Sequence, residues 1–321
     1  MLLTFALFLF SLFLVIKSAD FSVRYSTRLA KNLHLPKYII GFLIVAIISI
    51  FPESFISITS AIQGVPSFGL GTLFGSNVAD LTLVFALIVF VSGRRNLTVE
   101  SKVIKNKLLH IGIILIPVVF GLNGYYSRIE GVSLIIAGLL FFSYVLSKNE
   151  YGAKKIKEKF VFADVLLFAM SMIALLLGSY LTVRYSLVFA NDLQVSPLLI
   201  GIFIVGLGTT VPELFFSIRA AKKHHDDLAF GDILGTVMAD ATIVLGIMAA
   251  ISPFSFNPRL VYVTGVFMVL AMLLLFYFMK SGKVLTKKEA FFLLLFYTLL
   301  RYIFRNPVFL PTNLFIKNNI F

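Results

Sequence analysis

Ten long apolar runs, separated by short polar segments, constrain this chain more than any other feature of its sequence. They cover approximately residues 2–21, 38–62, 68–91, 109–123, 129–147, 161–185, 197–218, 228–252, 258–279 and 288–304. A helix needs roughly 20 apolar residues to cross the hydrocarbon of a bilayer. Strands of a membrane barrel would alternate polar and apolar residues, whereas these runs are continuous. The pattern predicts an all-α membrane protein with about ten transmembrane helices.

The composition excludes other classes of protein. Hydrophobic residues make up 59% of the 321 residues and charged residues only 13%, whereas a soluble domain has about 25% charged residues. A soluble enzyme and a disordered chain are therefore ruled out. The chain has no cysteine, so it can form no disulfide, thiolate nucleophile or cysteine metal site. The four histidines lie in loops or at the ends of runs, so a histidine metal site is not expected.

The net charge of +13 is read first as a signal of orientation. When the loops are assigned alternately to the two sides, most Lys and Arg residues fall on one side, including the basic segment 148–160. The positive-inside rule places that side in the cytoplasm. We therefore expect a multi-pass protein of the cell membrane with both termini extracellular. The charge reflects orientation and contact with lipid, and no nucleic-acid partner is expected.

The second half of the chain repeats the first at an offset of 160 residues. Among the matched positions are Pro52-Glu53 with Pro212-Glu213, Gly71 with Gly231, Gly75 with Gly235, and Asp80 with Asp240. Five runs separate the two copies, and an odd number inverts the second copy relative to the first. The sequence therefore predicts two inverted five-helix repeats, residues 1–147 and 161–321, joined by the loop 148–160. Inverted repeats are typical of secondary transporters, whose substrate site lies at mid-membrane between the repeats.

Four carboxylates fall in the middle third of apolar runs: Glu53, Asp80, Glu213 and Asp240. An acidic residue at the centre of a membrane helix costs about 2.5–3.5 kcal/mol on insertion scales. No basic residue lies in these segments at that depth. The carboxylates must therefore be paired with one another, protonated, or bound to cations.

Each acid has a hydroxyl residue four positions before it, which places both on one helix face. These residues are Ser49, Ser76, Thr209 and Thr236. A proline precedes each glutamate and frees backbone carbonyls of the helix, which lipid cannot satisfy. Carboxylates, hydroxyls and carbonyls are hard oxygen ligands of the kind that Ca²⁺ prefers. The pattern predicts a mid-membrane site for a hard cation.

Residues 201–221, GIFIVGLGTTVPELFFSIRAA, and 231–246, GDILGTVMADATIVLG, together with their first-half copies, resemble the repeats of the Ca²⁺:cation antiporter superfamily, sodium/calcium exchanger family. The resemblance implies ten helices, a central Ca²⁺ site and flanking Na⁺ sites. It implies Glu53 and Glu213 as the principal Ca²⁺ ligands, helped by Ser49 and Thr209, with Asp80 and Asp240 as the second pair. It also implies that the first and sixth helices slide past the rest during transport.

Two departures from the family pattern leave the coupling ion open. Ile50 stands where a hydroxyl is usual, although its repeat counterpart Thr210 keeps one, so one flanking site lacks an oxygen. Asp80 stands where sodium/calcium exchangers usually carry Asn. Four crowded negative charges disfavour full ionisation, so some protonation is expected. Both departures raise the chance of H⁺ coupling in place of Na⁺ coupling.

The function expected from these residues is exchange of Ca²⁺ for Na⁺ across the membrane by alternating access. The alternative is an H⁺-coupled antiporter of Ca²⁺ or another divalent cation, and a cation channel is a weaker one. Neither an enzymatic activity nor a cofactor is expected. The partners are the transported Ca²⁺, Na⁺ or H⁺ and the surrounding lipid. The oligomeric state stays open, with a monomer among the options.

Overall fold

The computed structural model describes residues 2–32, 37–93, 96–98, 106–147, 162–195, 197–224, 226–280 and 282–305. The first half contains α1 (Leu2–Asn32), α2 (Lys37–Ile62), α3 (Pro66–Ala79), α4 (Phe85–Val91), α6 (Lys107–Phe120) and α7 (Arg128–Ser147). The second half contains α8 (Phe162–Asp192), α9 (Pro197–Ile200), α10 (Gly206–Thr209), α11 (Val211–Lys222), α12 (Asp226–Ala239), α13 (Leu245–Ile251), α14 (Pro258–Leu260), α15 (Val266–Lys280) and α16 (Lys287–Arg305). In α2 the side chains are described from Ile50 onwards. The predicted basic loop 148–160 lies outside the described residues.

The helices occupy the apolar runs, as the sequence predicts. Every one of the ten runs contains helix in the structure. Among the described residues, six helical segments are long and apolar enough to cross a membrane. They are Pro66–Val91, Arg128–Val145, Phe162–Asp192, Pro197–Lys222, Ala229–Ile251 and Pro258–Lys280. The class of helical membrane protein is therefore confirmed, whereas a count of ten crossings stays a prediction.

Element boundaries recur between the two halves. Helix α3, the π-helical turn η1 (Asp80–Val84) and α4 form one continuous segment, and α12, the π-helical turn η4 (Asp240–Val244) and α13 form another. Every boundary of the second segment lies 160 residues after its counterpart in the first, and the ends of α8 follow those of α1 by the same offset. The repeat seen in the sequence therefore reappears in the local structure. Further π-helical turns are η3 (Gly201–Val205) and η5 (Val261–Gly265), and η2 (Gly121–Asn123) is a 3₁₀ turn.

Helices α7 and α16 begin with the same local motif. The backbone N–H and the hydroxyl of Ser127 both donate to Glu130, each at 2.7 Å. Thr286 makes the same pair of bonds to Glu289, at 2.7 and 2.8 Å. Each motif is a capping box, in which a side chain three residues into the helix satisfies a backbone donor that has no helical partner. Both helices therefore have a defined start after a short polar turn.

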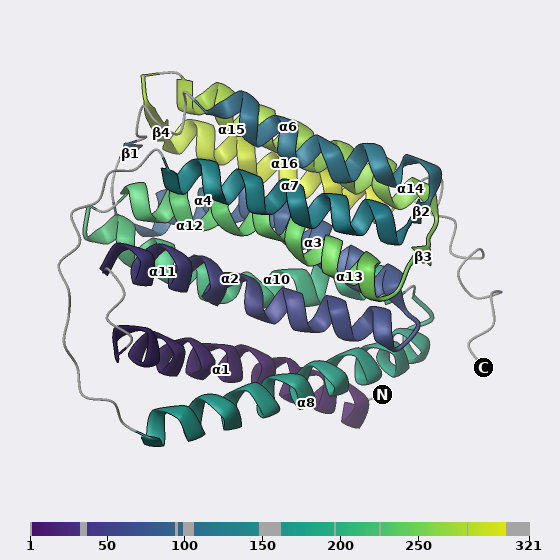
Figure 1. Ribbon diagram of the computed structural model, residues 1–321. Helices are drawn as coiled ribbons and strands as arrows, with labels where there is room; N and C mark the ends of the chain where they lie inside the picture. Colours follow the sequence, from purple (N-terminus) through teal and green to yellow (C-terminus); the bar gives the residue numbers. More distant parts are fainter. Residues whose placement is uncertain are drawn as a thin grey trace.

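Two small antiparallel sheets join the halves of the chain. Strand β1 (Asn96–Thr98) pairs with β4 (Val284–Thr286), with Leu97 opposite Leu285. Strand β2 (Tyr125–Tyr126) pairs with β3 (Phe254–Ser255). Figure 1 shows the two sheets at opposite ends of the helical bundle. Each sheet therefore ties a loop of the first half to a loop of the second.

Helices α1 and α8 lie side by side along one edge of the bundle (Figure 1). Their contact is apolar: the rings of Phe5 and Phe8 lie 5.0 and 5.9 Å from the ring of Phe189. A Cβ added to Gly178 would lie only 3.1–3.2 Å from atoms of Val15, so the glycine permits close approach of the two helices. The pair belongs to an apolar cluster separate from the main core. This separation matters for the transport cycle proposed below.

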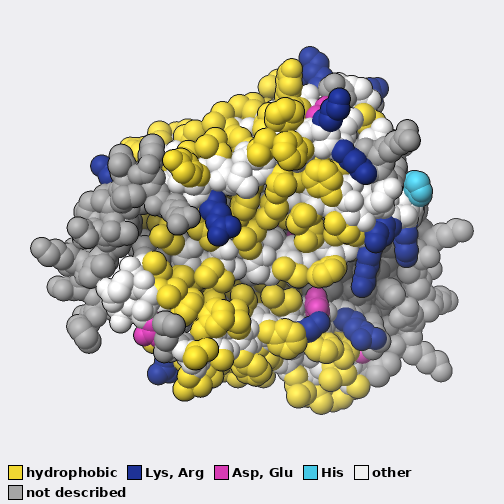
Figure 2. All heavy atoms as spheres, turned by 180° about the vertical axis from the view of Figure 1, so that it is seen from behind, with side chains coloured by type: hydrophobic (Ala, Val, Ile, Leu, Met, Phe, Trp, Pro, Cys, Tyr) yellow, Lys and Arg dark blue, Asp and Glu magenta, His cyan; other side chains and the backbone are white. Residues whose placement is uncertain are grey.

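The outer surface is apolar over much of its area. Leu2, Ile129 and Tyr277 are 82%, 79% and 72% exposed. Figure 2 shows hydrophobic side chains covering most of one face, with the visible Lys and Arg mostly toward the end where β1 and β4 lie. An exposed apolar surface of this extent marks contact with lipid rather than with water. The chain is a multi-pass membrane protein.

Candidate cation-binding site

Four buried carboxylates stand at repeated places in the fold. Glu53 lies in α2 directly after Pro52, and Glu213 lies in the first turn of α11 directly after Pro212. Asp80 and Asp240 are the first residues of the π-helical turns η1 and η4. No more than 1% of any of the four side chains is exposed. π-Helical turns inside α-helices are frequent at functional sites, and here each one begins at a predicted ligand.

Most oxygens of these carboxylates have no hydrogen-bond partner among the described residues. They are both oxygens of Asp80, Glu213 and Asp240, and Oε2 of Glu53. A buried ionised carboxylate without a partner is very unfavourable. The fold therefore keeps seven buried acceptor atoms open, which fits cations as the missing partners.

Charge repulsion shows that the four acids form one electrostatic group. Glu53 acts on Asp80, Glu213 and Asp240, and Asp80 acts on Glu213 and Asp240. In a low-dielectric interior such repulsion is strong unless a cation lies between the groups. The two repeats thus bring their acids into a common region, as expected for a site at the repeat interface.

A direct contact also crosses between the repeats. The side chains of Glu53 on α2 and Thr209 on α10 are hydrogen bonded. The Thr209 hydroxyl lies 3.1 Å from the carbonyl oxygens of both Val205 and Gly206 as well. One predicted hydroxyl ligand therefore lies next to a predicted carboxylate ligand of the opposite half.

The other predicted hydroxyls differ in their bonding. Ser76 in α3 donates to the carbonyl of Leu73, and Thr210, at the break between α10 and α11, donates to that of Leu207, both at 3.0 Å. The hydroxyl of Thr236 in α12 is fully buried and has no described partner. The side chain of Ser49 lies outside the described residues, although its backbone belongs to α2. Ile50 is half-buried and packs against the main apolar core.

Glycines on α3 allow the acid-bearing helices to approach. A Cβ on Gly75 would lie 2.7 Å from both Cα and the carbonyl oxygen of Ile202, and one on Gly71 would lie 2.6 Å from Leu198. These contacts place α3, which ends at Asp80, against the segment that leads to Glu213. The predicted role of the first glycine pair is confirmed. Gly231 and Gly235 have no described atom that close.

Two buried polar residues escaped the sequence reasoning. Asn77 is fully buried, and neither its amide oxygen nor its amide nitrogen has a described partner. Its repeat counterpart is Val237, so a search for matched polar pairs passes over it. Asp232 is 4% exposed, and its charge acts on both Asp80 and Glu213. Its counterpart Thr72 carries no charge, which hid it in the same way.

The donor set fits a hard cation better than a soft metal. It combines carboxylate, hydroxyl and amide oxygens, the ligands of Ca²⁺ and similar ions. Among the described residues, no three His, Asp or Glu side chains converge closely enough to hold a metal by themselves. Hydroxyl and amide oxygens would therefore have to complete the shell around two of the carboxylates.

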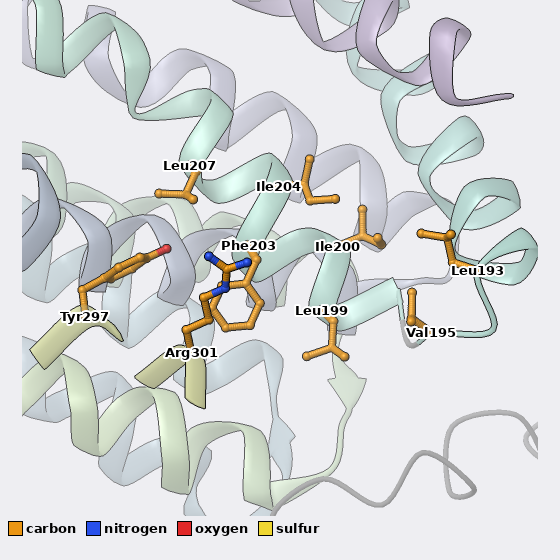
Figure 3. A pocket seen from close by; sticks show the side chains of 9 residues that line it. All are labelled: Leu193, Val195, Leu199, Ile200, Phe203, Ile204, Leu207, Tyr297 and Arg301. Carbon is orange, nitrogen blue, oxygen red and sulfur yellow. The ribbon is translucent and has the colours of Figure 1, made fainter. Parts of the chain in front are cut away.

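A separate pocket of about 380 Å³ lies beside α9, η3 and α10. Figure 3 shows apolar side chains around it, among them Leu199, Phe203 and Leu207, together with Tyr297 and Arg301 of α16. It is lined by no acid, and the guanidinium of Arg301 would repel a cation. This pocket is therefore not the cation site.

Together, the lipid-exposed helices and the buried open carboxylates define a membrane protein that handles cations. The family described as sodium/calcium exchanger protein matches residues 3–147 and 163–305. The chain belongs to this family, and it is a membrane cation exchanger rather than a member of an enzyme family. The resemblance seen in the sequence is confirmed.

Relatives and solved structures agree with this assignment. The chain is 28% identical to the inner membrane protein YrbG of Escherichia coli strain K12, over 80% of this chain and 83% of that protein. It is 23% identical to the sodium/calcium exchanger MaX1 of Methanosarcina acetivorans, over 91% and 96%. Solved structures of the sodium-calcium exchanger NCX_Mj share the fold, one with a TM-score of 0.65 and 25% identity over 94% of this chain and 98% of that one.

Proposed function

We propose that this protein exchanges Ca²⁺ for Na⁺ across the cell membrane by alternating access. The single observation that carries the proposal is the set of seven buried carboxylate oxygens without a described partner. Uncompensated charge at that depth is tolerated where it serves an ion pathway. Membership of the sodium/calcium exchanger family supports Ca²⁺ and Na⁺ as the cargo.

In this proposal Glu53 and Glu213 are the principal Ca²⁺ ligands. Thr209 lies beside Glu53 and supplies a hydroxyl, and Ser49 would do the same for the first repeat. Asp80 and Asp240, with Ser76 and Thr236 one turn before them, bind the countertransported ion. Thr210 contributes to a flanking Na⁺ site that Ile50 leaves without an oxygen on the opposite side.

The proposed topology has ten crossings in two inverted five-helix repeats, with both termini extracellular. The recurrence of element boundaries at an offset of 160 residues supports the repeats. The gathering of Lys and Arg toward one end supports the orientation (Figure 2). Helix α1 begins at the opposite end, where the N-terminus is marked in Figure 1.

The moving part of the cycle would be the α1–α8 pair. Its apolar cluster is separate from the main core, so sliding it requires fewer core contacts to break than moving any helix of the bundle. Sliding of packed helices is one of the known forms of conformational change. Its movement past α2 and the segment from α9 to α10 would open the carboxylates to one side at a time.

Exchange of Ca²⁺ for H⁺ is the second candidate, and Asp80 favours it. A fourth acid in place of Asn gives the site one more group that can carry a proton. The test is ⁴⁵Ca²⁺ uptake into proteoliposomes under an imposed Na⁺ gradient and, separately, under an imposed H⁺ gradient. Uptake driven by Na⁺ alone supports the first proposal, and uptake driven by H⁺ alone replaces it. Uptake without any countertransported ion would indicate a channel.

A further inference from the structure

Asp232 is a fifth buried acid, and it lies outside the four repeated positions. It is in α12, and its side chain is 4% exposed. The hydroxyl of Ser217, one helical turn after Glu213 on α11, donates to its Oδ2 at 3.2 Å. Its charge acts on Glu213 and Asp80. Asp232 is therefore coupled to the central carboxylates while lying nearer to the loop that joins α11 to α12.

Thr236 lies between Asp232 and Asp240 on the same face of α12, because residues four apart share a helix face. Buried hydroxyls elsewhere in these helices bond back to their own helix: Thr72 donates to Phe68, Ser76 to Leu73 and Thr242 to Met238. Thr236 does not, and its hydroxyl is fully buried without a described partner. An open hydroxyl between two acids is an oxygen available to a cation.

The first repeat has no equivalent arrangement. Thr72 stands in place of Asp232, and Ser57, the counterpart of Ser217, donates to the carbonyl of Gly69 at 3.2 Å. Repeat symmetry would give the same chemistry on both sides of the membrane. The acid at position 232 breaks that symmetry on one side only.

We propose that Asp232 and Thr236 form an outer subsite that takes a hard cation, Ca²⁺ or Na⁺, on its way between the central carboxylates and the side of the membrane that carries the α11–α12 loop. The inference rests on the proposed exchange function. The eight residues from Asp232 to Asp240 span about 12 Å along a helix axis, so the subsite is one step removed from the central site. An acid placed in such a path raises the local concentration of cations.

The test uses everted and right-side-out membrane vesicles, which expose opposite faces of the full-length protein. The Ca²⁺ concentration for half-maximal exchange is measured at each face for the wild type and for Asp232→Asn. We expect an increase of roughly tenfold at the face of the α11–α12 loop, with the other face and the maximal rate unchanged. Asp226→Asn is the matched control, because it removes an acid from the same helix outside the subsite, and it should leave both faces as they are.

Asp232→Thr, which installs the residue of the first repeat, provides a second variant if Asp232→Asn folds poorly, and it should show the same one-sided increase. An equal change at both faces would assign Asp232 to the central site or to stability and overturn the subsite. An unchanged half-maximal concentration at both faces would also overturn it. Wild-type vesicles without Na⁺- or H⁺-driven Ca²⁺ exchange would instead overturn the proposed function, and the subsite with it.

Discussion

The Glu53 side chain on α2 is hydrogen bonded to Thr209 on α10, so an acid of the first half meets a hydroxyl of the second. Neither residue has a neighbour of this kind within its own half at an equivalent spacing. The contact places the centre of the proposed site on the boundary between the halves. A ligand bound there would hold both halves at once.

Replacing Glu53 or Glu213 by Gln should abolish Ca²⁺ transport while leaving the protein folded. Gln keeps the shape but removes the charge, and a charge-assisted contact contributes about 1.5–3 kcal/mol. At 1.4 kcal/mol for each factor of ten, we expect transport at fixed Ca²⁺ to fall by roughly ten- to a hundredfold. The measurement is ⁴⁵Ca²⁺ uptake into vesicles, with size-exclusion chromatography as the control for folding. Uptake close to wild type in either variant would contradict the assignment of the central site.

Asp80→Asn should keep transport but change its pH dependence. Four carboxylates around one cation cannot all stay ionised cheaply, because each repels the others. Removing one charge relieves that repulsion, so protons should compete less well for the remaining three. We expect the pH at which exchange falls to half to move to a lower value in the variant. A folded Asp80→Asn protein without any exchange would show that the charge itself is required.

Ile50→Ser should steepen the Na⁺ dependence of exchange. Ile50 offers only methyl groups where Thr210 offers a hydroxyl, and Na⁺ that loses water there gains nothing in return. The variant restores an oxygen, so an additional Na⁺ can bind. The Hill slope of Na⁺-driven Ca²⁺ flux, measured for both proteins, tests this. Equal slopes in two active proteins would mean that this wall does not set the coupling ratio.

Gly75→Ala should destabilise the protein. The added methyl group would meet the backbone of Ile202, which cannot move aside as the end of a side chain can. Overpacking of this kind costs about 1–3 kcal/mol. Thermal unfolding in detergent should show a lower midpoint than for the wild type. Gly112→Ala in α6 is the matched control, since no described atom lies within 4 Å of its added Cβ. A midpoint for Gly75→Ala equal to that of the control would contradict the close contact.

The parts of this molecule that depend on local pattern could be predicted from the sequence. Apolar runs announce helices, and Pro52-Glu53 with Pro212-Glu213 announces the repeat, because proline and acid are rare at that depth. The role of Gly71 and Gly75 followed from their spacing. Family membership followed from the same residues.

Features that depend on which helices meet could not be predicted. Asp232 and Asn77 have counterparts of different chemistry, so repeat symmetry conceals them. The open hydroxyl of Thr236 and the back-bonded one of Ser76 occupy equivalent positions in the sequence. Only their bonding distinguishes them, and bonding depends on the three-dimensional surroundings.

The two strand pairs have a consequence for how the chain must be made. Strand β1 waits for β4, and β2 waits for β3, so neither loop of the first half can complete its hydrogen bonds until the second half has been synthesised. Contacts between residues so distant in sequence form late in folding. The first half must therefore wait in the membrane, beside the translocating machinery, with both ends of its helical bundle unfastened. Translation of the loop before α16 is the event that closes the last of them.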